Sequence, residues 1–593
     1  MLKIISLIMS VVMAASSFVY TAFNDIVDAV SELVFGIPYT AEAIKADFFS
    51  EIGDDDIVDI GGDRGFVNDK IAVFVDPEMK FSDRVEVVKN CGGIVLGWCM
   101  PTDLFVISCA PMSYDSVVAR CEKLQSINGV ELAVPVMASK TELNKTPDDK
   151  FDYEYEYDFD WNEIVPSGSN WWLEAIDARQ AWDYSDYFST IDIGILDSGF
   201  ETEHPDLTGK IVFPNSKQAR RNVAHEHGTH VAGIVSANHN GSGIAGICDD
   251  ARLVCVDWMP DSLQLWNTDI SILFGFSTLV KAGAKVVNLS LGSSGSKTSN
   301  SMGFIEAVFE TAITSYMMAS LLSKGYDFIA VQSAGNGDYF GDPVDASVNG
   351  HFCSLNEDNI FVGTKKVSAD DILDRIIIVA SARNNEDGTY TQSSFTNVGR
   401  TVSVAAPGED IYSSVVGGYA YMSGTSMAAP VVTAVASLVW SVNPSFTGPE
   451  VKDIVCTSTD SVAGIFTEWD YWYDVETLEY PMVNAKLAVE EAVRRTDSTV
   501  GTVSGKIIGD AAEIVCGDVS HTVFADGTYS FVVSEGTYEV EVYGAEGEFN
   551  GTFEITVTAG QTTAAEDYTV GEIIPDPEPD PEPETGYQTE GEM

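Results

Sequence analysis

Three short strings in the middle of the chain contain side chains that together could carry out acyl transfer. Asp197 begins Asp-Ser-Gly, His227 begins His-Gly-Thr-His-Val-Ala-Gly, and Ser426 lies within Ser-Gly-Thr-Ser-Met-Ala-Ala-Pro. A serine hydroxyl can attack a carbonyl carbon, a histidine can accept the hydroxyl proton, and an aspartate can orient that histidine. These residue types therefore predict nucleophilic catalysis by serine.

The expected positions of the three residues suit that chemistry. Residues 191–196 are an apolar run that predicts a buried strand, so Asp197 is expected at its carboxyl end, where parallel sheets place their sites. Apolar helical stretches follow His227 and Ser426, which puts the serine hydroxyl near the positive end of a helix. Each string alone has a commoner structural interpretation, as a turn, a core or surface histidine, or a loop. Their joint occurrence in the order Asp, His, Ser favours catalysis.

A large α/β unit must hold these strings in place. Between about residues 171 and 494, short apolar runs alternate with helical stretches, which is typical of a doubly wound, mostly parallel sheet. The runs that predict its strands lie at 191–196, 286–291, 328–333 and 376–380.

The segment before this unit has a different pattern. Apolar alternation predicts strands at 71–75, 93–100, 104–110 and 130–136, with helices at 82–91 and 113–127. The order β-α-β-β-α-β is that of a ferredoxin-like α+β domain, which we place at residues 66–140. An acidic stretch from residue 141 to 166 predicts a linker.

The two ends of the chain add further segments. Lys3, an apolar run and small residues after it predict a signal peptide over 1–23, with an uncleaved membrane anchor as the alternative. Short strands rich in Thr, Val and Tyr predict a small β-sandwich over 498–571. Residues 572–593 form an acidic, Pro-rich tail.

Composition limits the partners of this chain. With 32 basic and 90 acidic residues, the net charge is −58, which disfavours binding to nucleic acid or to anionic membranes. Such carboxylates either form a solvated surface or bind cations such as calcium. The nine cysteines are odd in number and lack metal-ligand spacing, so at least one thiol is free and a zinc site is not expected.

Residues 171–494 resemble the subtilisin-like serine peptidases. Besides the three strings, the chain contains four further segments similar to that family. These are His-Pro-Asp-Leu at 204–207, Asn-Leu-Ser-Leu-Gly at 288–292, Ala-Gly-Asn at 334–336 and Val-Asn-Ala at 483–485. The resemblance implies a subtilisin-like fold, preceded by a ferredoxin-like prodomain and followed by the small β-sandwich.

The resemblance also implies roles for individual residues. Ser426 would attack the scissile carbonyl, with His227 as the base and Asp197 orienting it. The side chain of Asn336 and the backbone N–H of Ser426 would hold the oxyanion. Residues Ser290, Leu291 and Gly292 would pair with the substrate backbone as an added strand. Neither His225 nor His230 is expected to act as the base.

A structural calcium ion is a weaker implication of the same resemblance. Asp206 and Asn240, with carbonyls of the loop at 238–244, have the hard oxygen atoms that Ca²⁺ prefers. The alternative is a metal-free glycine turn. No cofactor is required for the chemistry itself.

The resemblance also implies roles for the segments on either side of the α/β unit. Residues 66–140 would be a propeptide that assists folding and then inhibits the peptidase domain at 148–495, with self-cleavage between about 136 and 149. The alternative is a permanently attached domain. Extra residues between Gly292 and Asn336, including 304–326, are expected to form surface loops that shape specificity. The sandwich resembles carboxypeptidase-regulatory domains and would be a spacer or a binding module.

Together these features predict a secreted, extracellular serine endopeptidase made as a zymogen. Its partners would be protein or peptide substrates and its own propeptide, with no nucleic acid and no stable membrane span in the mature form. The main alternative is a binding or adhesion protein with an inactive peptidase scaffold, which the complete Asp, His, Ser and Asn set disfavours. A narrow processing peptidase remains a further alternative.

Overall fold

The computed structural model describes residues 48–140 and 170–570, with short gaps inside both ranges. The chain divides into two compact units, residues 1–492 and residues 493–593, and each is described by itself. The expected signal peptide, acidic linker and Pro-rich tail lie outside the described residues. All nine cysteines lie among the described residues, and no disulfide joins them there.

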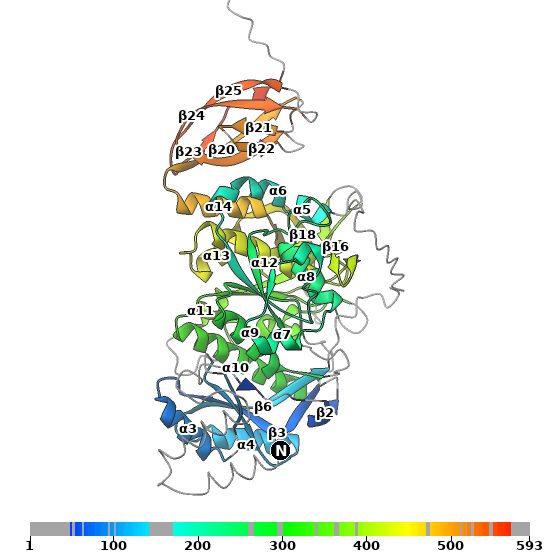
Figure 1. The fold of residues 1–593 in the computed structure, drawn as a ribbon, viewed down its shortest axis with the longest axis vertical. Coiled ribbons are helices and arrows are strands. Elements are labelled where there is room, and N and C mark those ends of the chain that lie inside the picture. Colours follow the sequence, from blue (N-terminus) through cyan, green and yellow to red (C-terminus); the bar gives the residue numbers. More distant parts are fainter. Residues whose placement is uncertain are drawn as a thin grey trace, which may run out of the picture. The chain divides into compact units, whose positions relative to one another are not determined.

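A mostly parallel sheet forms the centre of the first unit (Figure 1). Its strand order is β18-β19-β15-β13-β12-β11-β7-β9-β8, with β14 paired to β13. The four apolar runs expected to be strands correspond to β7, β11, β12 and β13, which are parallel neighbours at the centre. The strands are β7 (Ile191–Asp197), β8 (Ile211–Val212), β9 (Ala251–Asp257), β11 (Val286–Leu289), β12 (Ile329–Ser333), β13 (Ile376–Asn384), β14 (Tyr390–Gln392), β15 (Val404–Pro407), β18 (Thr459–Trp469) and β19 (Val475–Val483).

Helices cover both faces of this sheet, as expected for a doubly wound fold (Figure 1). Among them α12 is buried along its whole length, and it is the one described helix long and apolar enough to cross a membrane. Its length therefore reflects a position in the protein core. The helices are α5 (Trp171–Ala175), α6 (Ala178–Ala181), α7 (Ser216–Arg221), α8 (Glu226–Ser236), α9 (Asp269–Lys281), α10 (Ser301–Ser323), α11 (Ala369–Leu373), α12 (Thr425–Val442), α13 (Gly448–Thr457) and α14 (Ala485–Thr496).

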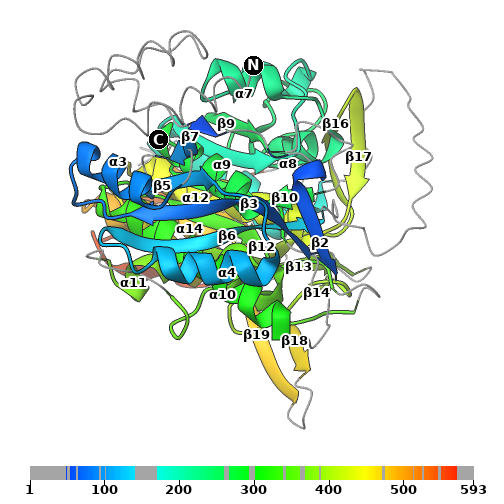
Figure 2. The same cartoon turned by 90° about the horizontal axis from the view of Figure 1, so that it is seen from below.

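The N-terminal region has the expected β-α-β-β-α-β order, and its sheet runs β4-β5-β3-β6 with antiparallel neighbours. One face of this sheet packs on α3 and α4 (Figure 2). At one edge, β6 pairs with β10 (Trp266–Thr268), so the sheet continues into the following part of the unit. The other elements are β1 (Phe48–Phe49), β2 (Ile57–Gly61), β3 (Arg64–Val75), α3 (Phe81–Asn90), β4 (Val95–Cys99), β5 (Leu104–Ser108), α4 (Tyr114–Leu124) and β6 (Val130–Lys140).

The second face of the N-terminal sheet packs on α9 and α10, and this contact corrects one expectation. Residues 304–326 do not form a surface loop, because most of them belong to α10. Tyr316, Met317 and Met318 are fully buried, and the ring centroids of Tyr316 and Phe74 lie 4.7 Å apart. From Phe309 to Leu322, where its side chains are described, no residue of the helix is exposed, because this part lies between two layers.

The second unit contains two four-stranded sheets, β23-β20-β26 with β27 and β22-β21-β24-β25. They share one buried core that includes Phe531, Val540 and Ile555. This arrangement agrees with the alternating strand pattern of the sequence. The strands are β20 (Val500–Ile508), β21 (Glu513–Cys516), β22 (Val519–Thr522), β23 (Thr528–Ser534), β24 (Gly536–Tyr543), β25 (Phe549–Val557), β26 (Thr562–Ala564) and β27 (Tyr568–Thr569).

Candidate active site

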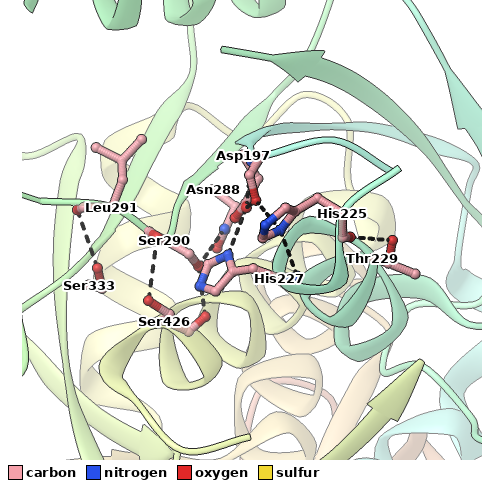
Figure 3. Close-up of polar contacts among 10 residues, drawn as sticks. Asp197, His225, His227, Thr229, Asn288, Ser290, Leu291, Ser333 and Ser426 are labelled. Atoms are coloured by element: carbon pink, nitrogen blue, oxygen red, sulfur yellow. Dashed lines mark hydrogen bonds and ion pairs between the residues drawn. The ribbon is translucent and has the colours of Figure 1, made fainter. Parts of the chain in front are cut away.

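Asp197 is the last residue of β7 and is buried at the carboxyl end of the central sheet. Its Oδ1 accepts three hydrogen bonds, from His227 Nδ1 at 2.7 Å, from the Ser198 backbone N–H at 2.7 Å and from Ser198 Oγ at 3.1 Å (Figure 3). These hydrogen bonds fix the orientation of the carboxylate toward the neighbouring imidazole.

His227 lies in the first turn of α8, directly opposite Asp197. The side chain of His225 caps this helix, because its Nδ1 accepts from the His227 backbone N–H at 3.2 Å. Gly228 allows the helix to start close to β7, since a Cβ at this position would overlap the carbonyl oxygens of Ser198 and Gly199. The glycine after the histidine is therefore needed for the short distance between Asp197 and His227.

The electrostatics of His227 favour its role as a base. Burial alone disfavours the charged imidazole, but the negative charge of Asp197 and its hydrogen bond outweigh that effect, so the pKa of His227 is raised. The His227 side chain keeps 17% of its surface exposed, so it is open to an incoming molecule. By contrast, the pKa of His225 is lowered, mainly by burial and to a lesser extent by the nearby His227. The capping imidazole is therefore kept neutral.

Ser426 lies in the first turn of α12 and is 1% exposed. The imidazole of His227 lies between Asp197 and Ser426 (Figure 3). Ser290 ties the helix start to the end of β11, because Ser290 Oγ donates to the Ser426 carbonyl at 2.7 Å. In turn, Asn288 Nδ2 donates to Ser290 Oγ at 2.9 Å. The sequence strings that contain Asp197, His227 and Ser426 thus meet at one point.

Asn336 follows β12 and faces the start of α12. Its Oδ1 accepts the backbone N–H and the hydroxyl of Thr425, at 2.9 and 2.8 Å, which fixes the orientation of the amide. Its Nδ2 is buried and has no hydrogen-bond partner among the described residues. A Cβ added to Gly424 would lie 3.2 Å from Asn336 Nδ2 and 3.6 Å from the Ser426 backbone nitrogen. Both nitrogen atoms therefore border one small space, which could accommodate a developing oxyanion.

The three residues expected to bind the substrate backbone follow β11 and lie beside Ser426. Ser426 Oγ is 3.4 Å from the Ser290 carbonyl oxygen. The Leu291 carbonyl is turned inward, since it accepts from Gln332 Nε2 at 3.1 Å and from Ser333 Oγ at 3.4 Å. That carbonyl is therefore engaged within the protein.

The residues expected to hold calcium do not fit a cation. Asp206 Oδ1 accepts from Asn240 Nδ2 at 3.1 Å, while Oδ2 accepts from the Ile244 N–H at 2.9 Å and from the Tyr419 hydroxyl at 2.8 Å. Asn240 Oδ1 is turned away and accepts from Ser242. Among the described residues, no group of three or more His, Cys, Asp or Glu side chains is placed to bind a metal. The geometry agrees with the alternative, a loop closed by hydrogen bonds.

His230, the second histidine of its string, is fully buried. Its Nε2 lies 2.9 Å from the Ile411 carbonyl oxygen and 3.2 Å from that of Ala420, in the hairpin of β16 (Ile411–Val415) and β17 (Gly418–Met422). Burial and the nearby His227 lower its pKa to about 3. A neutral imidazole donating to backbone carbonyls has a structural role.

Some residues that support the site were not given that role from the sequence. Ser198 supports Asp197 from the next position, and His225 supports His227 from two positions before it, whereas Thr425 supports the distant Asn336 and lies one position before Ser426. This proximity was the available signal. No signal marked Asn349, whose side chain lies against Gly292 and Gly335.

Comparisons with known proteins agree with this fold. The sequence model of the subtilase family (Peptidase_S8) matches residues 189–490. Thermitase from Thermoactinomyces vulgaris is 32% identical over 314 residues, which cover 52% of this chain and 94% of thermitase. Subtilisin NAT from Bacillus subtilis subsp. natto is 26% identical over 318 residues, covering 53% of this chain and 70% of that protein.

Among solved structures, fervidolysin from Fervidobacterium pennivorans, described as a keratinolytic enzyme related to subtilisin, is 20% identical and has a TM-score of 0.49. The match covers 88% of this chain and 80% of that chain. The extent of the family match and the coverage of thermitase decide the classification: this chain belongs to the subtilase family and is a subtilisin-like serine peptidase.

Proposed function

We propose that the protein is a secreted serine endopeptidase that uses Asp197, His227 and Ser426 and is made as a self-inhibited zymogen. The observation that carries the catalytic part is the position of His227. One of its nitrogens is bonded to buried Asp197, and its ring lies between that carboxylate and Ser426 (Figure 3). This is the geometry that a nucleophile, base and orienting acid require.

In the first step, Ser426 Oγ attacks the scissile carbonyl carbon while His227 Nε2 accepts the hydroxyl proton. Asp197 holds the proton on His227 Nδ1, so Nε2 is the free base, and it stabilises the imidazolium that forms. The raised pKa of His227 has the same cause, because the negative charge of Asp197 favours the protonated ring.

The tetrahedral oxyanion would be held by Asn336 Nδ2 and the Ser426 N–H. Collapse of this intermediate breaks the C–N bond, and the leaving amine takes the proton from His227. A water molecule then attacks the acyl-enzyme with His227 again as base, which releases the acid and restores the Ser426 hydroxyl. No cofactor takes part in these steps.

Active-site labelling tests the catalytic proposal. A fluorophosphonate reacts with an activated serine, so the processed wild-type protein should be labelled at Ser426, as located by peptide mass spectrometry. S426A should not be labelled, whereas S445A, which changes an exposed serine, should be labelled like the wild type. A processed wild-type protein that stays unlabelled would support the alternative, a binding protein with an inactive scaffold.

The zymogen part of the proposal rests on the contact between the N-terminal region and the rest of the first unit. The N-terminal sheet and helices α9 and α10 share one apolar core. Its members from the N-terminal sheet include Val67, Ala72, Phe74, Val106, Leu132, Val134 and Val136. Removal of such a core from water is the main source of affinity between two protein surfaces.

Polar contacts add specificity to this interface. Buried Asp103 accepts from Arg84 Nη1 at 2.8 Å within the N-terminal region, and also from Lys324 Nζ at the end of α10. Next to it, Ser320 Oγ donates to the Thr102 carbonyl at 3.1 Å. Together with the pairing of β6 and β10, these contacts support an inhibitor that binds in one orientation.

Self-cleavage distinguishes a zymogen from a permanently attached domain. The wild-type chain should yield two fragments, with a new N-terminus between about residues 136 and 149. S426A should remain uncut. Cleavage of S426A at the same position, or an active wild type that is never cut, would contradict the zymogen proposal. Intact-mass analysis of protein from the culture medium also tests secretion, since loss of about residues 1–23 is expected.

A further inference from the structure

We propose that Asn349 limits which substrates are cleaved, by closing the pocket that receives the side chain on the acyl side of the scissile bond. The residue at that position should be small: glycine, alanine or serine. This inference rests on the function proposed above and names the substrate class of the same site.

The position of the pocket follows from the attack geometry. The scissile carbonyl carbon must approach Ser426 Oγ while its oxygen points to Asn336 Nδ2. The adjoining Cα is only about 1.5 Å from that carbon, so its side chain begins in the same space. Strands β11 and β12 are parallel neighbours, and the segments 290–292 and 333–336 leave their carboxyl ends side by side. The substrate side chain therefore enters between these two segments.

Asn349 occupies the space between them. A Cβ added to Gly292 would overlap the Cγ, Oδ1 and Nδ2 atoms of Asn349. A Cβ added to Gly335 would lie 2.9 Å from Cγ and Oδ1 of the same side chain. One carboxamide thus contacts a glycine of each segment and fills the width of the gap.

The carboxamide is held in place on several sides. Asn349 Nδ2 donates to the Ser333 carbonyl at 2.8 Å. The residues that follow Asn349 are also fixed, because the Phe352 N–H donates to Gln332 Oε1 at 2.9 Å. In addition, the His351 N–H donates to Glu310 Oε1 of α10 at 2.9 Å. Only 6% of the surface of Asn349 is exposed, so the residue has little room to swing aside.

The chemistry of the pocket follows from these contacts. Since Nδ2 is engaged by Ser333, the oxygen of the carboxamide is the polar atom left to face a substrate, and no described residue donates to it. Glycine and alanine fit without displacing Asn349, and a serine hydroxyl can donate to Oδ1. Leucine or phenylalanine would have to displace a bonded side chain. One misplaced methylene in such a pocket already changes discrimination by about tenfold or more.

Peptide-library cleavage by the processed enzyme tests the inference. Wild type should cleave after glycine, alanine or serine with a kcat/KM at least about tenfold above that after leucine or phenylalanine. N349A removes the carboxamide and should raise kcat/KM for the large residues by about tenfold or more relative to alanine. N356A, the same change at an exposed position of the same loop, should leave the wild-type preference unchanged.

Two results separate a failure of this inference from a failure of the proposed function. If wild type is labelled by the fluorophosphonate but prefers leucine or phenylalanine, or if labelled N349A keeps the wild-type preference, Asn349 does not close the pocket. Should N349A fail to fold, the wild-type preference alone still decides. If processed wild type is not labelled at all, the peptidase function itself fails.

Discussion

Asn336 and Thr425 fix each other across the site: the asparagine oxygen accepts both the backbone N–H and the hydroxyl of Thr425. These two bonds also fix the nitrogen of the same amide. Asn336 Nδ2 is held pointing into the space beside Ser426 and has no partner among the described residues. A donor that is oriented before the substrate arrives need not reorganise during the reaction.

Removal of this donor should slow the chemical step. N336A is expected to lower kcat by about 10²–10³ with little change in KM, since the donor acts on the oxyanion of the transition state. T425V should lower kcat by a smaller factor, because one of the two bonds that orient Asn336 is lost, whereas T425S should retain activity. Steady-state kinetics on one peptide substrate measures all three variants. A rise in KM alone for N336A would contradict the assignment.

The pH dependence of the reaction should report the Asp197–His227 contact. His227 must be neutral to accept a proton, and its pKa is raised by Asp197. Activity should therefore fall with decreasing pH through a midpoint above the ordinary histidine value of about 6.5. In D197N the negative charge is gone, so the midpoint should move to lower pH and kcat should drop by about 10⁴. A profile of log(kcat/KM) against pH measures both; an unchanged midpoint in D197N would rule out this coupling.

Calcium should not stabilise the protein through Asp206 and Asn240. Both oxygens of Asp206 accept hydrogen bonds, and Asn240 presents an N–H donor to it. We expect the change in Tm on adding millimolar Ca²⁺, or a chelator, to be the same in wild type and in N240A. Differential scanning fluorimetry gives this comparison. A calcium-dependent increase in Tm that N240A abolishes would show that the loop binds the ion after all.

Lys324 should strengthen the binding of the cleaved N-terminal region to the rest of the first unit. A hydrogen bond between charged groups contributes about 1.5–3 kcal/mol, so K324A should weaken the complex by about 10- to 100-fold. The lag before activity appears after dilution should become shorter. K123A, an exposed lysine on the outer helix α4, is the matched control and should keep the wild-type lag. Equal lags for K324A and wild type would mean that the apolar core alone sets the affinity.

The meeting of Asp197, His227 and Ser426 could be predicted because the string around each residue is local. Neighbouring residues such as Gly228 allow the same contact. The ends of β3 could not be predicted. The strand starts at Arg64, whereas the sequence predicts a start at residue 71. The polar residues Asn68 and Asp69 interrupt the apolar pattern, and they lie where the pairing of β3 with β6 shifts register. The position of α10 could not be predicted either. An apolar segment without a polar stripe gives no sign of which layers will cover it. Asn349 reaches the pocket only through tertiary folding.

The position of α10 between two layers also has a consequence for protein synthesis. Its buried residues, such as Tyr316 against Phe74, need a cover that the chain itself supplies. The strands that form this cover end at Lys140, so the ribosome completes them before it begins residue 301. N-terminal segments of a chain generally fold first. The N-terminal sheet should therefore already be folded when the apolar helix emerges from the ribosome, and can cover it at once.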